Sequence, residues 1–218
     1  MFDFYGTLTV PLPAEHHRTH LAPIAEALGC HPDDFQAAWS ASFYERATGA
    51  WGSPRESMRR ALAHLPLDLS DERVEAALRL RESRFGEYVQ LRPDTLDTLM
   101  GLRERGLRVA VLSDCTDELP IIWPSLPVAP LVDVTVFSYE YGAHKPDPSL
   151  YAAAAEQLGV LASECLYVGD GGSDELAGAE RAGMRAVQIS AEGHLGYGHQ
   201  PWEGPVVQSL WDLLEVVA

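Results

Sequence analysis

The spacing of apolar residues predicts helices along the first part of the chain, from residue 11 to about residue 90. One helix carries Leu21, Ile24 and Leu28 on one side and is expected to stop at Gly29, while a second covers residues 33–48. No strand-like alternation interrupts this stretch. The segment is therefore predicted to be all-helical.

The remaining helices of this segment are indicated by their first residues. Ser53 is suited to cap a helix, Pro54 to occupy its first position, and Glu56 to complete a capping box. Ser70 is expected to begin the last helix.

From residue 93 onward, short apolar runs alternate with helical patterns. The expected strands cover residues 108–113, 132–138, 165–169 and 185–190. The expected helices cover residues 93–105, 148–158, 174–182 and 206–217, and a surface loop covers 193–205. This alternation is typical of βαβ units, which form a parallel sheet with right-handed crossovers.

The opening residues supply one more strand, which ends at Asp3. The predicted fold class is α/β, with a Rossmann-like parallel sheet core formed by residues 1–10 and 91–218 and an inserted all-helical segment at 11–90. Strands usually run about 5–6 residues, yet only two residues precede Asp3. We expect either a clipped central strand or an upstream start, with in-frame codons for a short apolar run.

The chain carries a formal charge of −16, from 32 acidic and 16 basic residues. Such a protein repels nucleic acid and anionic membrane, so neither is expected as a partner. An anionic small-molecule substrate would need a local positive group. The chain has no run of 18 apolar residues and no basic leader followed by an apolar stretch, so a cytoplasmic protein is expected.

Three residue types carry further information. Of the 16 basic residues, Lys145 alone is a lysine, and a compact ammonium group can do what a planar guanidinium cannot. The three cysteines lack metal-site spacing and are expected to be plain thiols. His16 and His20 share a helix face, which is expected to be solvated.

Polar groups follow the predicted strands at the point where each one ends. Asp3 ends the first strand, Ser113 and Asp114 end the next, and Lys145 and Asp170 follow later ones. Ligands of open parallel sheets bind beyond the carboxyl ends of the strands. We therefore expect these residues to meet in one crevice.

Several carboxylates would crowd that crevice, namely Asp3, Asp170, Asp174 and Glu175. Unpaired, they would repel and raise one another's pKa. Mg²⁺ resolves this repulsion, because it takes oxygen ligands from one or two carboxylates and leaves room for a substrate phosphate. Lys145 would add a positive charge beside Asp3. The metal and the lysine together would attract an anionic substrate, which the net negative charge of the protein repels.

Together these motifs resemble the haloacid dehalogenase (HAD) superfamily. The run F-D-F-Y-G-T-L looks like its nucleophile motif, and V-L-S-D looks like its second motif, in which Ser113 holds a phosphate oxygen. K-P-D-P at Lys145 looks like the third motif, and G-D-G-G-S-D-E-L with the following G-A-E-R-A-G-M looks like the acidic fourth. The resemblance implies a helical cap over residues 11–90 and an aspartyl-phosphate intermediate on Asp3. It implies a metal site drawn from Asp3, Tyr5, Asp170, Asp174 and Glu175.

One departure lies at Tyr5, where most phosphatases of the family carry an aspartate as general acid and base. A phenol with a pKa of about 10 replaces it poorly, and a lost general acid lowers the rate by about 10²–10⁴. D-x-Y-G-T-L and K-P-D-P with Tyr151 resemble the 2-haloacid dehalogenases, whose departing halide needs no proton. Those enzymes lack the Gly-Asp pair of the fourth motif and need no metal, so the retained Asp170 favours phosphoryl transfer.

The sequence therefore predicts a Mg²⁺-dependent phosphatase that acts on a small phosphorylated metabolite. A 2-haloacid dehalogenase and a non-catalytic protein that binds a phosphorylated ligand are the alternatives. Without an acid at Tyr5, aryl and acyl phosphates should react faster than alkyl phosphates. His144 is a candidate replacement donor, Arg46 and Asp114 are candidates for substrate contact, and Cys115 shows no partner base that would make it a nucleophile. Both a monomer and a homodimer fit the sequence.

Overall fold

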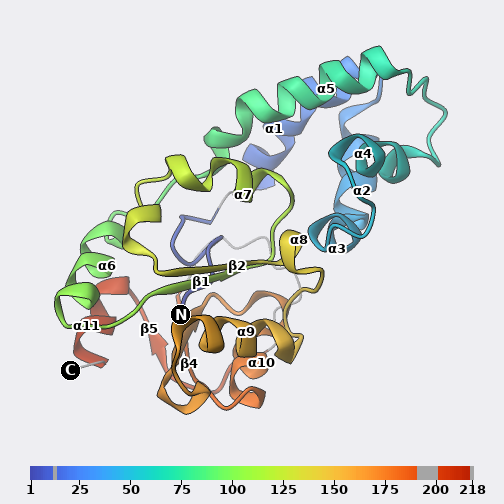
Figure 1. Ribbon diagram of the computed structural model, residues 1–218. Coiled ribbons are helices and arrows are strands. Elements are labelled where there is room, and N and C mark those ends of the chain that lie inside the picture. Colours follow the sequence, from blue (N-terminus) through green and yellow to red (C-terminus); the bar gives the residue numbers. More distant parts are fainter. Residues whose placement is uncertain (12–13, 191–200, 217–218) are drawn as a thin grey trace.

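The computed structural model describes residues 1–11, 14–190 and 201–216 of the protein. Its strands are β1 (Ala110–Ser113), β2 (Val134–Phe137), β3 (Leu166–Gly169), β4 (Arg185–Ile189) and β5 (Val206–Val207). β1 pairs with β2, β3 pairs with β4, and β4 pairs with β5, all in parallel. Phe2 joins the two halves, because it bridges in parallel to Val111 of β1 and to Val168 of β3. The segment that carries Asp3 therefore lies in the middle of the sheet (Figure 1).

Helices cover both faces of this sheet, which explains why its strands are apolar throughout. The helices on the two faces are α6 (Thr95–Glu104) with α11 (Leu213–Val216), and α9 (Pro148–Leu158) with α10 (Glu175–Arg181). Successive strand residues point to opposite faces. Val111 accordingly packs into the core beneath α6, and Leu112 packs into the core beneath α9.

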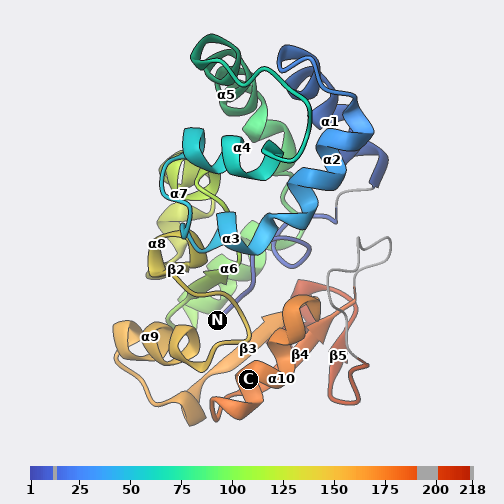
Figure 2. The same cartoon turned by 90° about the vertical axis from the view of Figure 1, so that its right-hand side faces the viewer.

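The segment between the opening residues and β1 folds as predicted into helices, which we call the insert helices. They are α1 (Ala14–Ala27), α2 (Pro32–Ala41), α3 (Phe43–Ala47), α4 (Pro54–Leu62) and α5 (Asp71–Arg84). They gather at one end of the molecule, above the sheet (Figure 2). They share a core of their own, in which Ile24, Leu28 and Phe35 are fully buried. Ser53 caps α4 as predicted, because its hydroxyl accepts a hydrogen bond from the Glu56 amide at 3.2 Å.

Two predicted helices are wrong in their extent. The helix expected over 33–48 breaks at Ser42, whose hydroxyl donates to the Trp39 carbonyl and accepts from Arg46 Nε. The helix expected over 206–217 begins instead as β5, because the edge of β4 needs partners. Gln188 and Ser190 donate their amides to the carbonyls on either side of Val206. Local side-chain hydrogen bonds accompany the break at Ser42, whereas pairing with a distant strand overrides local periodicity at the chain end.

Short elements outside the predicted set complete the chain. They are α7 (Glu118–Ile122), α8 (Ser138–Tyr141) and the 3₁₀ turns η1 (Phe85–Tyr88), η2 (Trp123–Ser125), η3 (Ala129–Leu131), η4 (Ala162–Glu164), η5 (Gly172–Asp174) and η6 (Leu210–Asp212). Most of the loop predicted over 193–205 lies outside the described residues. No helix within the described ranges is long and apolar enough to cross a membrane.

The insert helices are tied to the sheet layer through α8. The Ser138 hydroxyl donates to the Ala47 carbonyl at 2.7 Å, and the Tyr139 hydroxyl donates to the Gly52 carbonyl at 3.3 Å. Gly49 is required at this junction, because a Cβ there would lie 2.7 Å from the Tyr139 carbonyl oxygen. The same Ser138 hydroxyl accepts the Cys115 amide at 2.9 Å, which fixes the turn that follows β1.

Candidate active site

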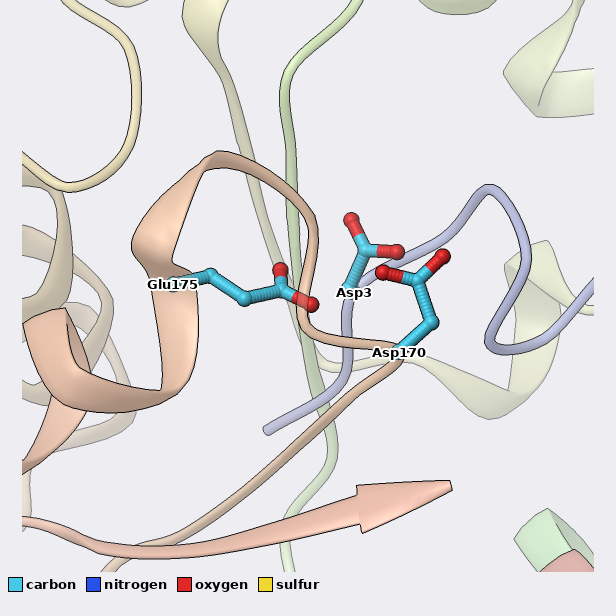
Figure 3. Close-up of side chains that lie close together, drawn as sticks. All are labelled: Asp3, Asp170 and Glu175. Carbon is cyan, nitrogen blue, oxygen red and sulfur yellow. The ribbon is translucent and has the colours of Figure 1, made fainter. Parts of the chain in front are cut away.

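The candidate residues meet beyond the carboxyl ends of the central strands, as the sequence predicts. Asp3 follows Phe2, and its amide donates to the Val168 carbonyl at 2.9 Å. Asp170 follows β3, and Glu175 is the first residue of α10. Their three carboxylates converge (Figure 3), and each offers an oxygen within 4.8 Å of the others.

Lys145 lies between two of these carboxylates. Its Nζ donates to Asp3 Oδ1 at 2.5 Å and to Glu175 Oε2 at 2.6 Å, and the residue is 3% exposed. Burial alone would lower the pKa of this ammonium, but Asp3 and Glu175 outweigh it and hold the pKa well above its ordinary value. The single lysine of the chain is therefore a buried, charged group that contacts the predicted nucleophile.

Glu175 is held in one orientation. Its Oε1 accepts the Gly171 amide at 3.0 Å, and its Oε2 accepts the Tyr167 hydroxyl at 2.8 Å besides Lys145. A Cβ at Gly169 would collide with this carboxylate, which explains the glycine of the Gly-Asp pair. Glu175 is therefore a positioning residue that aligns Lys145 with Asp3.

A divalent cation fits the remaining acidity of the cluster. The pKa of Asp3 is raised to about 7 by burial, which the Lys145 charge opposes and the Glu175 charge reinforces. The pKa of Asp170 is raised to about 9 by burial, and Glu175 and Asp3 raise it further. Three buried carboxylates thus lie beside one lysine. A hard cation that binds oxygen ligands would neutralise the negative charge that the lysine leaves uncompensated. Because Glu175 is taken up by Lys145 and Tyr167, Asp3 and Asp170 are the residues placed to ligate the ion directly.

Asp174, which the sequence places among the candidate ligands, does not join this cluster. Its backbone is left-handed, with φ 52°, and its carboxylate accepts from Arg181 Nη2 at 2.9 Å with the side chain 35% exposed. This carboxylate therefore turns to the surface while Glu175, one residue later, turns inward. Of the two acidic candidates, the structure brings only Glu175 to Asp3.

Ser113 and Tyr5, two further sequence candidates, differ in their surroundings, because Tyr5 lines the cavity and Ser113 is not among the described residues that line it. The Ser113 hydroxyl is fully buried at the end of β1 and has no hydrogen-bond partner among the described residues. Tyr5 lines the cavity beside Asp3, and burial, then the nearby Cys115 and Glu118, raise the pKa of its phenol well above the usual value. Tyr5 therefore stays neutral and is a poor proton donor, whereas Ser113 offers a hydroxyl that no described group uses.

A cavity of about 280 Å³ opens above this cluster toward the insert helices. Its floor includes Asp3, Lys145 and Asp170. Its walls are mostly apolar and include Val10, Leu21, Ile24, Trp39, Phe43 and Phe85. A small molecule with an anionic reacting group and an apolar body would match this shape.

Arg46 lines the cavity, as the sequence suggested. Its guanidinium carbon lies 3.7 Å from the centre of the Trp39 ring, and its Nη2 donates to the Trp39 carbonyl at 2.7 Å. His20 also lines the cavity and is 6% exposed, so the expectation of a solvated position was wrong for this residue. α1 packs against both α5 and α2, and the sequence pattern did not reveal which of its faces this packing would bury.

Arg81 of α5 is a site residue that the sequence did not single out. Its guanidinium donates to both carboxylate oxygens of Asp117, at 3.0 and 2.8 Å, and pairs with Glu118. It therefore links an insert helix to the segment leading into α7, at the wall of the cavity. Several arginines lie along α5, and burial alone distinguishes this one, so no sequence pattern could have found it.

Two other sequence candidates are resolved by their surroundings. Cys115 lines the cavity, but burial raises the pKa of its thiol well above the ordinary value, so it is not a thiolate nucleophile. His144 stacks on Tyr44, with ring centroids 4.3 Å apart, and its Nδ1 lies 2.6 Å from the Lys145 carbonyl oxygen. It is not among the described residues that line the cavity.

Comparison with known proteins agrees with this geometry. The sequence model of the haloacid dehalogenase-like hydrolases matches residues 1–183. The chain belongs to the haloacid dehalogenase-like hydrolase family. The resemblance recognised in the four motifs and the predicted α/β fold are thereby confirmed, and the matched family is one of hydrolases.

Relatives within the family carry both phosphatase and dehalogenase names. A glyceraldehyde 3-phosphate phosphatase of Methanopyrus kandleri is 35% identical over 52% of this chain, which spans about half (49%) of that protein's length. The (S)-2-haloacid dehalogenase 4A of Burkholderia cepacia is 28% identical over 98% of this chain and 93% of its own. A crystal structure described as a dehalogenase superposes with a TM-score of 0.67 at 25% identity, covering 99% of this chain and 94% of its own. The family is certain, and the choice between the two chemistries depends on the site.

Magnesium should raise the melting temperature of the metal-free protein more at pH 8.5 than at pH 6. The folded pKa of Asp170, about 9, lies above its ordinary value of 3.8. Between these values the folded carboxyl keeps a proton that the unfolded one has lost, so stability falls as pH rises. A cation neutralises the ionised carboxylates and restores that stability. Thermal unfolding with MgCl₂ or EDTA measures the shift, Asp170→Asn is the control, and equal shifts at both pH values would contradict the expectation.

Proposed function

We propose that this HAD-like hydrolase is a Mg²⁺-dependent phosphatase, which acts on a small phosphorylated metabolite through an aspartyl-phosphate on Asp3. The observation that carries the proposal is the buried cluster of Asp3, Asp170 and Glu175 around Lys145. Hydrolysis at a halogenated carbon needs no such excess of carboxylates. A phosphate dianion next to Asp3 does need the positive charge that a lysine and a cation supply.

The residues of the chain divide the work of the reaction. Asp3 attacks phosphorus as the bond to the leaving oxygen breaks, and water then displaces Asp3 from the phosphoryl group. Lys145 fixes the Asp3 carboxylate and counters the charge of the phosphoryl oxygens. The Ser113 hydroxyl donates to one of those oxygens. When bound by Asp3 and Asp170, Mg²⁺ adds positive charge beside the same phosphoryl group.

The insert helices serve as the cap of this enzyme, corresponding to residues 11–90, and they set its specificity. The part of the cavity wall that the insert helices supply comes from α1, α2 and α3, with Arg81 of α5. Its apolar surface and the buried Arg46 favour a compact substrate with an apolar body and a second polar end. Enclosed sites of this kind exclude water and strengthen charge interactions.

A 2-haloacid dehalogenase is the second candidate, and particular observations favour it. Tyr5 is a neutral phenol at the position of the family's usual acid, and Arg46 lies in the cavity where it could bind a carboxylate. The dehalogenase of Burkholderia cepacia also matches nearly the whole chain. A non-catalytic role would keep the same pocket for a bound phosphorylated ligand.

A panel of phosphorylated metabolites and 2-haloacids, each with Mg²⁺ and with EDTA, separates the three functions. We expect release of inorganic phosphate from at least one phosphate ester and its complete loss in EDTA. Chloride release from 2-chloropropionate that EDTA leaves unchanged would establish the dehalogenase instead. Tight binding of a phosphorylated compound with no turnover in either class would establish the binding protein.

A further inference from the structure

The turn after β1 places one more carboxylate in the cavity. Asp114 lines the cavity wall together with Asp3 and Lys145. Its Oδ1 accepts the Lys145 amide at 2.9 Å, whereas its Oδ2 is buried and has no hydrogen-bond partner among the described residues. A buried carboxylate oxygen without a donor is costly for a structural residue. No described donor competes for this oxygen, so it is available to hold a proton.

The strand register sets Asp114 beside the position of the missing acid. Phe2 pairs with Val111, and Tyr5 and Asp114 each lie three residues beyond that pair on adjacent segments of the sheet. Both chains have left the strand at this point, and both residues line the cavity. Asp114 therefore lines the cavity from the neighbouring strand end, at the level where Tyr5 replaces the usual aspartate.

We propose that Asp114 is the general acid and base of this enzyme, in place of the carboxyl group that Tyr5 lacks; the proposal rests on the proposed phosphatase function. As the Asp3 oxygen bonds to phosphorus and the ester P–O bond breaks, protonated Asp114 gives its proton to the departing oxygen. In the second step, ionised Asp114 takes a proton from the water that attacks phosphorus. The P–O bond to Asp3 then breaks, and Asp114 is again protonated.

The surroundings of Asp114 suit this exchange. Burial raises the pKa of its carboxyl, and Glu175 raises it further, while the charge and backbone amide of Lys145 and the charge of His144 lower it. A phosphate dianion bound at Asp3 would add to the upward shift, which favours the protonated form before ester cleavage. The carboxyl is also held in position, because Lys145 donates to its Oδ1 and the Cys115 amide donates to Ser138.

Four other ionisable groups near the cavity are less suited to this role. Glu118 is already paired with buried Arg81. Tyr5 and Cys115 have pKa values well above their ordinary ones. His144 stacks on Tyr44 and does not line the cavity.

Asp114→Asn should separate substrates by the basicity of their leaving groups. Asparagine keeps the oxygen that accepts the Lys145 amide, so the turn is expected to stay folded. For phenyl phosphate, whose leaving group has a pKa of about 10, kcat/KM should fall by about 10²–10⁴. For p-nitrophenyl phosphate, whose leaving group needs little protonation, kcat/KM should change by less than about tenfold. The limb of the pH–rate profile that reports the acid should disappear in the variant.

The proposal revises the leaving-group preference expected from Tyr5 alone. In Asp114→Asn, kcat/KM should fall steeply as the leaving group becomes more basic. In the wild-type enzyme, kcat/KM should depend only weakly on leaving-group basicity. Equal losses for both esters, or equal slopes in the two proteins, would overturn the role of Asp114.

One control variant and two possible outcomes separate the role of Asp114 from the proposed phosphatase function. Asp68→Asn makes the same chemical change at an exposed position of the insert and should alter neither ester. If wild-type enzyme releases phosphate in an Asp3-dependent reaction while Asp114→Asn shows no leaving-group effect, phosphatase function stands and Asp114 is excluded. If wild-type enzyme hydrolyses no phosphate ester, both proposals fail together.

Discussion

Asp3→Asn is expected to abolish phosphate release, with a fall in kcat of about 10⁴-fold or more. The amide cannot displace a leaving group from phosphorus, and no other nucleophile of the site can replace it. Cys115 is a buried thiol whose pKa is raised well above its ordinary value, and Ser113 has no described partner that would act as its base. Release of p-nitrophenolate, followed in a long incubation of concentrated protein, measures the residual rate.

The fold should survive this substitution. Asn has nearly the volume of Asp, and the ionised form of Asp3 is already disfavoured by burial, which raises its pKa to about 7. Thermal unfolding and circular dichroism of Asp3→Asn should therefore match those of the wild-type protein closely. The control variant Asp68→Asn should match the wild-type protein in both stability and activity. An Asp3→Asn protein that retains more than about one hundredth of the rate would contradict the role of Asp3 as nucleophile.

Lys145→Met is expected to remove activity and to lower the free energy of unfolding by about 3–5 kcal/mol. Methionine fits the path of the lysine side chain but leaves the buried carboxylates of Asp3 and Glu175 without their shared cation. Urea unfolding measures the stability, and phosphate release measures the activity. The loss of stability should shrink as pH falls, because protonation of these carboxyl groups then removes the unpaired charge.

Lys145→Arg is the matched control for charge. It keeps a positive group but replaces a compact ammonium with a planar fork, at a site where the residue is 3% exposed and contacts two carboxylates at 2.5 and 2.6 Å. We expect it to recover part of the stability and little of the activity. Full activity in Lys145→Arg would show that charge alone suffices, and unchanged stability in Lys145→Met would show that the buried pairs contribute nothing.

The motifs and the apolar periodicity were sufficient to predict the sheet and its neighbours. The helix expected over 148–158 coincides with α9, since Pro148 and Gly159 mark its two ends in the sequence. The approach of Lys145 to Asp3 also followed from sequence, because parallel strands bring their carboxyl ends to one edge. The end of the chain did not follow, because β5 exists only through pairing with β4.

The site itself divides in the same way. The meeting of Asp3, Lys145 and Asp170 was predictable from the sequence, because motif order and βαβ topology place all three at the carboxyl edge of the sheet. The sequence did not reveal that Glu175 turns inward while Asp174 turns to Arg181, because this depends on the left-handed backbone that Asp174 adopts in the folded protein. The tertiary structure also brought Arg81 and His20 to the cavity, because which side of a helix is buried depends on the helices packed against it. The same dependence on distant packing left one oxygen of Asp114 without a partner, and no property of the residue alone could reveal that.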